Sequence, residues 1–341
     1  MSRAETKVKV ALVGCGYWGP NLARNFHQLS DAELVACCDL DPGNLQRMES
    51  LYPARVTPDL GAILSDPEIE AVALATPVGT HYEIARQLLL AGKHLLVEKP
   101  LTTSSAEAEE LISLARRQER VLMVGHVFEY NPAVLKIKDL IDEGQIGQVY
   151  YLYSNRVNLG RVQSDINVLW SIAPHDVSIA LFLLEEMPVQ VSARGASYLN
   201  GRVEDVVFVT MFFPGDVMAH IQASWLDPSK VRRMTVVGSE KMIIYDDVAS
   251  EGKVKIYDKG VYRKGDSIYG EFQYKIHSGD INIPKINMSE PLRNECAHFV
   301  ECVRSGASPR TGGENGLRVV RVLEAAQRSL SSGGETVRLK S

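Results

Sequence analysis

Three glycines near the start of the chain, Gly14, Gly16 and Gly19, directly follow an apolar, partly β-branched run at residues 8–13. Such a run is typical of a buried parallel strand, and a strand that breaks into a glycine turn indicates a phosphate-binding site. Gly14 permits the tight turn, Gly16 lets the backbone approach a pyrophosphate, and Gly19 lets the next helix pack closely on the strand. A helix over residues 20–29 then presents free N–H groups and the positive end of its dipole to the phosphates. The spacing therefore predicts a dinucleotide-binding turn.

An acidic residue further along favours this interpretation over an ordinary glycine turn. A second apolar strand, residues 34–38, ends at Asp39, twenty residues after Gly19. A carboxylate there accepts hydrogen bonds from the hydroxyls of the adenosine ribose and repels a 2′-phosphate. The sequence therefore predicts NAD rather than NADP as the cofactor. The alternative is that Asp39 is a turn residue at the end of its strand.

Apolar strand patterns and helix patterns alternate up to about residue 125. This alternation predicts a doubly wound parallel sheet with right-handed crossovers, in which ligands bind beyond the carboxyl ends of the strands. For His81, a surface position at the start of a helix is an equally good interpretation. Because ligands bind beyond the carboxyl ends of the strands, we expect the cofactor-binding residues to lie along one rim of the sheet. They are Gly14, Gly16, Tyr17, Trp18, Gly19, Asp39, Thr76, Pro77, His81, Glu98 and Lys99.

The pattern changes after residue 126. Strand-like stretches with turn residues between them run from residue 149 to residue 257, and one helix, residues 174–184, interrupts them. We expect an α+β domain on a mostly antiparallel open sheet, followed by an irregular segment at residues 279–289 and two closing helices. The predicted domains are a NAD-binding Rossmann domain, 1–126, and a substrate-binding and oligomerisation domain, 127–341, whose C-terminal helices are free to pack back on the first.

The overall composition restricts the class of protein. The 341 residues carry 37 basic and 42 acidic side chains, a net charge of −5, with 45% hydrophobic and 23% charged residues. This composition is ordinary for a globular chain of two domains. The chain has no overall excess of positive charge, which would favour binding to nucleic acid or to an anionic membrane. Neither a signal peptide nor a membrane span is expected, so we expect a cytoplasmic protein. The five cysteines show no CxxC spacing, which favours buried reduced thiols and no metal site.

Two further motifs point to a family. Glu98-Lys99-Pro100 follows the fifth strand pattern, and Ala173-Pro174-His175-Asp176 opens a predicted helix in the second domain. With the glycine turn, these motifs resemble those of the Gfo/Idh/MocA oxidoreductases over essentially the whole chain. The resemblance implies that the protein oxidises or reduces one carbon of a sugar, cyclitol or sugar nucleotide with a nicotinamide cofactor. The stretches GYWGPNLARNF and NVLWSIAPHDVSI are most similar to the sugar-nucleotide branch, in particular the UDP-N-acetylglucosamine 3-dehydrogenases.

The resemblance assigns the proton chemistry to Lys99 and His175. Oxidation of a secondary alcohol needs a group that takes the hydroxyl proton while the cofactor takes the hydride. An ammonium at Lys99 stabilises the developing alkoxide, the alternative being a surface lysine paired with Glu98. His175 follows Pro174 in the first turn of a helix, where the dipole favours the neutral imidazole that a base requires. The alternative is a histidine that caps or packs at a helix start.

One position departs from the family. Many members carry an aspartate four residues before the histidine, whereas this chain has Ser171. A serine hydroxyl forms hydrogen bonds but does not serve as a carboxylate base, which disfavours a plain polyol as the substrate. Asp176 either orients the site or is a first-turn carboxylate that the helix dipole favours.

A UDP-sugar also needs cationic partners for its diphosphate, and arginine supplies paired donors. Arg156, Arg161, Arg232 and Arg233 are the available candidates. Each of the predicted substrate residues has a solvated loop position as its alternative interpretation. The polar stretch before the predicted catalytic helix ranks first, and we predict that the substrate contacts Arg156, Asn158, Arg161, Asn167, Trp170 and His175.

The leading hypothesis is NAD-dependent oxidation of the C3 hydroxyl of a UDP-sugar to a 3-keto sugar nucleotide, with UDP-N-acetylglucosamine as the first candidate substrate. One alternative is the same chemistry on another sugar nucleotide or an inositol-type cyclitol. Another is a regulator that keeps the fold only to sense NAD, but the presence of both Lys99 and His175 argues against it. Members of the family associate through the exposed face of the second sheet, so the resemblance also implies a homodimer or homotetramer.

Overall fold

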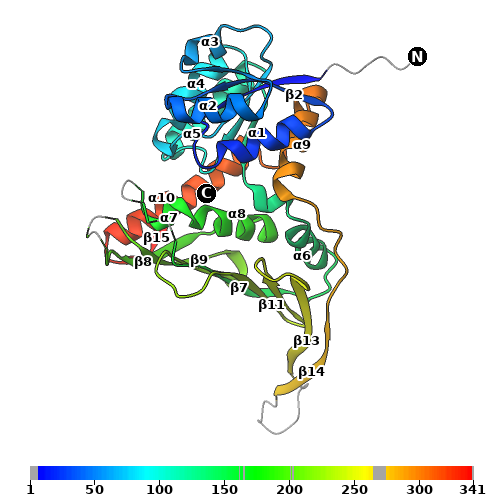
Figure 1. Cartoon of the computed structure of the whole chain (residues 1–341). Helices are drawn as coiled ribbons and strands as arrows, with labels where there is room; N and C mark the ends of the chain where they lie inside the picture. The colour runs from blue at the N-terminus through cyan, green and yellow to red at the C-terminus, as the bar shows by residue number, and fades with distance from the viewer. Residues whose placement is uncertain are drawn as a thin grey trace. The chain divides into compact units, whose positions relative to one another are not determined.

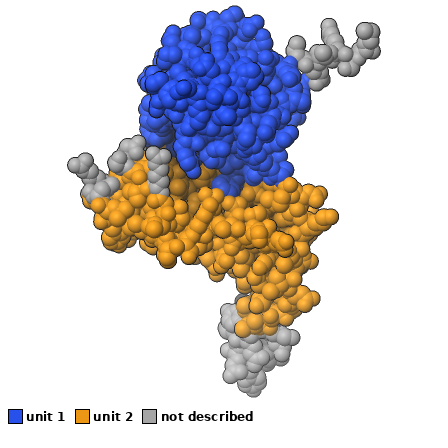
Figure 2. All heavy atoms as spheres, viewed as in Figure 1, with its two compact units in different colours: residues 1–130, 289–321 blue, residues 131–288, 322–341 orange. Residues whose placement is uncertain are grey.

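The computed structural model describes residues 7–160, 162–163, 166–199, 201, 203–263 and 274–339. The chain forms two compact units (Figures 1 and 2). Unit 1 comprises residues 1–130 and 289–321, and unit 2 comprises residues 131–288 and 322–341. The predicted boundary after residue 126 lies close to the first division, and residues 289–321 return to unit 1. No helix in the described part of the chain combines the length and the apolar character that crossing a bilayer requires.

Unit 1 is built on a six-stranded sheet in the order β3-β2-β1-β4-β5-β6, and all neighbouring strands are parallel. Most of its strands are apolar and buried, as strands that helices cover on both faces must be. The predicted doubly wound sheet is therefore confirmed. The order reverses between β1 and β4, so a ligand crevice is expected at the carboxyl ends of these strands. The strands are β1 (Val8–Val13), β2 (Ala32–Cys38), β3 (Arg55–Thr57), β4 (Ala71–Leu74), β5 (His94–Glu98) and β6 (Leu122–Gly125).

The helices of unit 1 bury one face each against this sheet or against one another. Phe26 and Phe299 meet edge to face, with ring centroids 6.3 Å apart, and each buried ring contributes about 2 kcal/mol. The five cysteines of the chain are buried free thiols, as predicted. The helices are α1 (Gly19–Gln28), α2 (Pro42–Leu51), α3 (Leu60–Leu64), α4 (His81–Leu90), α5 (Ser105–Arg117), α9 (Pro291–Ser305) and the first part of α10 (Gly313–Ser331), with short 3₁₀ turns η1 (Val78–Thr80) and η2 (Val127–Tyr130). The residues of α10 after 321 belong to unit 2.

Unit 2 is built on a nine-stranded sheet in the order β14-β13-β12-β11-β7-β10-β9-β8-β15. Among the described strands of this sheet, only β7 and β10 pair in parallel, which confirms the predicted mostly antiparallel sheet. The prediction that residues 279–289 are irregular is wrong for residues 279–282, because they pair with β13 as the end of β14. The strands are β7 (Val149–Val157), β8 (Gln190–Ala196), β9 (Val206–Phe212), β10 (Met218–Ser224), β11 (Val231–Gly238), β12 (Met242–Asp246), β13 (Val254–Arg263), β14 (Tyr274–Asn282) and β15 (Val337–Arg338).

Helices cover one face of this second sheet (Figure 1). They are α6 (Pro132–Asp142), α7 (Val168–Ser171) and α8 (Ala173–Leu184), while the turn η3 (Pro214–Asp216) joins β9 to β10. Along β7 the side chains alternate, so that Leu152, Ser154 and Arg156 are buried while Tyr151 and Tyr153 are 40% exposed. The register therefore assigns each residue of the central strands either to the face under the helices or to the opposite, exposed face.

Candidate active site

The glycine turn of unit 1 joins β1 to α1. Gly14 has φ of +94°, a conformation that glycine adopts readily and other residues rarely do. A methyl group added at Gly19 would lie 2.2 Å from the Gly14 carbonyl oxygen, so helix and turn pack as closely as the motif requires. A methyl group added at Gly16 would meet no protein atom within 4 Å. The space over Gly16 is thus left open for a group that is not protein.

These contacts predict different effects of an alanine substitution at Gly19 and at Gly16. Gly19→Ala is expected to destabilise the fold by about 3 kcal/mol, because the clash is with backbone that cannot move aside. Gly16→Ala is expected to leave the free energy of unfolding within about 0.5 kcal/mol of wild type. It is nevertheless expected to weaken NAD binding about tenfold, because the methyl occupies the space for the pyrophosphate. Chemical denaturation and NAD titration check both results, and equal NAD affinity in Gly16→Ala would contradict the assignment.

The N-terminus of α1 and Asp39 complete this part of the site. No side chain caps α1, so a phosphate can approach its N-terminus, where Pro20 has no N–H and the Asn21 N–H donates to the Trp18 carbonyl oxygen at 2.9 Å. One Asp39 carboxylate oxygen accepts a hydrogen bond from the Cys15 backbone N–H at 2.6 Å, and the other accepts from the Asp41 N–H at 2.8 Å. Asp39 therefore holds the glycine turn in shape as well as ending β2. Of the neighbouring predicted residues, Tyr17 is 84% exposed, whereas Trp18 packs on the core of unit 1.

His81 ties together the loops that follow β4 and β5. Its ring nitrogens lie 2.9 Å from the carbonyl oxygens of Thr76 and Pro100, and the residue is buried. The alternative of a surface histidine is thus wrong. Burial lowers the pKa of His81, although the two carbonyl contacts favour the protonated ring. His81 positions the loop that carries Lys99, and its contact with the cofactor, like that of Thr76 and Pro77, stays a prediction.

Lys99 follows the last residue of β5, at the rim that the topology predicts. The Glu98 carboxylate accepts a hydrogen bond from the Lys99 backbone N–H at 3.2 Å. Burial raises the pKa of Glu98 to about 7, although the Lys99 charge opposes the rise. Glu98 therefore carries only part of a negative charge near neutral pH, and it neutralises Lys99 only in part. A lysine ammonium in such a setting can stabilise an oxyanion.

Two buried groups lie electrostatically close to this pair. His126 follows β6, which pairs with β5, and burial together with the Lys99 charge lowers the pKa of His126 to about 3. On α9, burial and the charges of Glu98 and Glu129 raise the pKa of Glu295 well above its usual range. Burial thus favours the neutral form of both groups beside the Glu98–Lys99 pair. Glu295 was not among the predicted site residues, although a carboxyl group on the apolar stripe of α9 was a usable signal.

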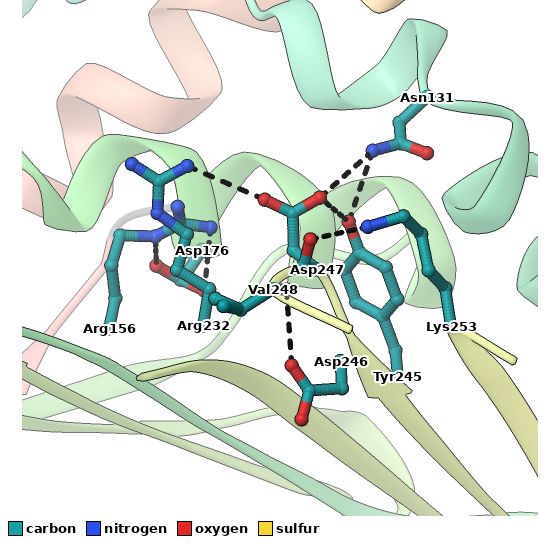
Figure 3. A network of polar contacts seen from close by, with 9 residues as sticks. All are labelled: Asn131, Arg156, Asp176, Arg232, Tyr245, Asp246, Asp247, Val248 and Lys253. Atoms are coloured by element: carbon teal, nitrogen blue, oxygen red, sulfur yellow. Dashed lines mark hydrogen bonds and ion pairs between the residues drawn. The ribbon is translucent and has the colours of Figure 1, made fainter. Parts of the chain in front are cut away.

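The second set of predicted residues belongs to unit 2. His175 stands in the first turn of α8, which has proline at its start, as predicted. The next residue, Asp176, forms an ion pair with Arg156 of β7, and the two side chains are only 5% and 8% exposed (Figure 3). The pair fixes the first turn of α8 to the sheet and so positions His175. Direct contact of Arg156 with substrate stays a prediction.

The other predicted substrate residues of unit 2 surround the short helix α7. Asn167 caps α7 by accepting from the Trp170 N–H at 3.2 Å, and its amide donates to Glu204 and Gln327. The Trp170 indole N–H donates to the same Gln327 oxygen at 3.1 Å. These contacts give Asn167 and Trp170 a structural role that the sequence did not suggest. Asn158 is half-buried just after β7, and Arg161 lies outside the described residues.

The residues of unit 1 fit a nicotinamide dinucleotide. The open space over Gly16, the uncapped N-terminus of α1 and the carboxylate of Asp39 match the needs of a pyrophosphate and an adenosine ribose. When bound, NAD supplies the hydride acceptor of the reaction. Lys99, at the end of β5, lies at the same rim of the sheet as this loop.

Two protein-family models match the chain. The oxidoreductase family with an NAD-binding Rossmann fold matches residues 8–126, and the Gfo/Idh/MocA C-terminal domain matches residues 134–244. The first match lies in unit 1 and the second in unit 2, and together they cover more than half of the chain.

Similar proteins act on different sugars and cyclitols. The UDP-N-acetylglucosamine 3-dehydrogenase of Acidithiobacillus ferrooxidans is 26% identical over 254 residues, which are 74% of this chain and 78% of that protein. The inositol 2-dehydrogenase of Rhizobium meliloti is 25% identical over 95% of this chain and 97% of that protein. Among solved structures, GenD2 from gentamicin A biosynthesis in complex with NAD has a TM-score of 0.84 and 25% identity, covering 100% of this chain and 98% of that one. With both of its domains matched, the chain belongs to the Gfo/Idh/MocA family of NAD-dependent sugar and cyclitol oxidoreductases.

Proposed function

We propose that the protein oxidises the C3 hydroxyl of a UDP-sugar, best represented by UDP-N-acetylglucosamine, to a 3-keto sugar nucleotide with NAD. The main support for this reaction class is the position of Lys99, at the rim of a sheet whose glycine turn fits the cofactor. The similarity to a UDP-N-acetylglucosamine 3-dehydrogenase and the serine at position 171 support the substrate.

In this proposal Lys99 and His175 share the work on the reacting hydroxyl. The Lys99 ammonium stabilises negative charge on the oxygen as the C–H bond breaks. His175 accepts the hydroxyl proton, and its place in the first turn of α8 favours the neutral imidazole that can do so. Asp176 is held by Arg156, so it orients this turn rather than competing for the proton.

An inositol-type cyclitol is the second candidate substrate. The inositol 2-dehydrogenase relative aligns over a larger share of this chain than the sugar-nucleotide relative does. Ser171 argues in the other direction, because the carboxylate that many polyol-oxidising relatives carry there is missing.

A substrate panel separates the candidates. Purified protein is mixed with NAD, a hydroxylamine-type carbonyl trap and, in turn, UDP-sugars, dTDP-sugars, free hexosamines and inositols. The trap is needed because alcohol oxidation by NAD is unfavourable near neutral pH. We expect NADH and a trapped keto product with UDP-N-acetylglucosamine. Turnover of inositol alone would favour the cyclitol, and NAD binding without turnover of any compound would favour an NAD-sensing regulator.

We also propose that copies of the chain associate through the exposed face of the second sheet. Four large apolar side chains on this face, Tyr151, Tyr153, Phe208 and Met218, are each 40–45% exposed. Their strands, β7, β10 and β9, are adjacent, so these side chains form one patch. Light scattering is expected to give a mass of two or four chains, and a mass equal to one chain would contradict the proposal.

A further inference from the structure

Two arginines on neighbouring strands of unit 2 lie beside the turn that carries His175. Arg156 of β7 and Arg232 of β11 are directly opposite in the register, so they share the sheet face under α8. Neighbouring strands lie about 4.8 Å apart, so the two arginines stand next to one another on this face. Figure 3 shows them side by side near Asp176 and Asp247.

The two arginines differ in how firmly they are held. Arg156 is buried and contacts both carboxylate oxygens of Asp176. The Arg232 side chain is 39% exposed and contacts Asp247 through one nitrogen at 3.4 Å, a weak hydrogen bond. Arg232 can therefore turn to a ligand at low cost, whereas Arg156 cannot do so without leaving Asp176 buried and unpaired.

Asp247 does not depend on Arg232 for its partners. The Tyr245 hydroxyl donates to Asp247 at 2.9 Å, and the Asn131 amide lies 3.5 Å from the same carboxylate oxygen. Tyr245 is itself buried and accepts from Asn131 at 3.1 Å. Figure 3 shows these two neutral partners of the carboxylate, which remain when the guanidinium moves away.

We propose that Arg232 binds the diphosphate of the substrate and thereby selects sugar nucleotides over neutral sugars and cyclitols. The inference rests on the proposed function and deepens it by naming the residue that recognises the anion. Arg156 acts as a positioning residue behind it, because its guanidinium is committed to Asp176. A phosphate accepts paired hydrogen bonds from arginine, and it replaces the single weak contact with Asp247.

Arg233 supplies a matched control. It is the next residue on β11 and pairs with Asp246 at 2.9 Å. On β7 it is opposite Asn155, so Arg233 lies on the face away from the helices. The Arg233 side chain is 53% exposed. Arg232→Gln and Arg233→Gln therefore make the same chemical change one residue apart, each removing one ion pair to an aspartate, on opposite faces of the sheet.

The test measures binding of UDP itself by calorimetry, so that it does not depend on turnover. Arg232→Gln is expected to weaken UDP binding at least about tenfold, as the loss of a charge-assisted contact predicts. Arg233→Gln is expected to stay within about twofold of wild type. Asp247→Asn is expected to retain or improve UDP affinity, since it releases Arg232. If Arg232 only supported the fold, Asp247→Asn would weaken binding as Arg232→Gln does.

Steady-state kinetics of the same variants show whether a negative result concerns the role of Arg232 alone or the proposed function as well. With UDP-N-acetylglucosamine, Arg232→Gln is expected to raise KM while kcat changes little. Equal UDP affinity in wild type and Arg232→Gln, with UDP-N-acetylglucosamine turned over by both, would overturn the inference and leave the function standing. Wild-type protein that oxidises inositol but does not bind UDP would overturn both.

Discussion

Lys99→Met is expected to reduce kcat about 10³-fold while the affinity for NAD changes little. The ammonium acts on charge that develops only as the hydroxyl is oxidised, so its loss falls on the rate rather than on binding. Lys99 stands directly after β5, and the Glu98 carboxylate beside it is only partly ionised near neutral pH. Methionine has a similar length but carries no charge, so the variant loses the stabilisation that the Lys99 ammonium gives to the oxyanion.

Lys9→Met is the matched control for this variant. Lys9 belongs to β1 of the same sheet, close to the amino end of the strand, and pairs with Glu68 at 3.2 Å. It is therefore at the opposite edge from the carboxyl ends where ligands bind. Turnover by Lys9→Met should match that of wild type. Undiminished turnover by Lys99→Met would remove Lys99 from the mechanism.

His175→Asn is expected to lower kcat about 10²- to 10³-fold, the usual loss on removing a general base. An amide keeps some hydrogen bonding but does not accept a proton. Residual activity is expected to rise with pH, because hydroxide or water then takes the proton in place of the imidazole. The measurement is a pH profile of kcat for wild type and variant, with thermal unfolding to show that α8 remains in place.

His277→Gln is the corresponding control in unit 2. His277 is on β14, where its ring lies 3.0 Å from the Asp258 carboxylate. The variant should keep both kcat and its pH dependence. If His175→Asn gives the same kcat and the same profile as wild type, the proton acceptor lies elsewhere.

The fold was predictable where local sequence determines it. The parallel sheet follows from alternating strand and helix patterns. Gly14 and Gly19 indicate a turn that tolerates no side chain at either position. The second sheet follows from period-two alternation, as on β7. The end of β14 was missed because residues 279–282 contain Gly279 and two polar residues, and only pairing with β13 makes them a strand.

The site was predictable as a set of motifs but not as a set of contacts. Lys99, His175 and Asp39 stand next to recognisable strand ends or helix starts, so their positions follow from local signals. The pairing of Arg156 with Asp176 and the register of Arg156 against Arg232 depend on which strands become neighbours. Local patterns carry no information on that choice.

Oxidation at C3 is tested most directly with UDP-N-acetylglucosamine that carries deuterium in place of hydrogen at C3. The protein is mixed with this compound, NAD and a carbonyl trap, and the NADH and the trapped product are analysed by mass. We expect NADH that is one mass unit heavier and a keto product without deuterium. Unlabelled NADH would mean that another carbon is oxidised, and no NADH from this compound alongside turnover of a neutral sugar or cyclitol would contradict the proposed substrate.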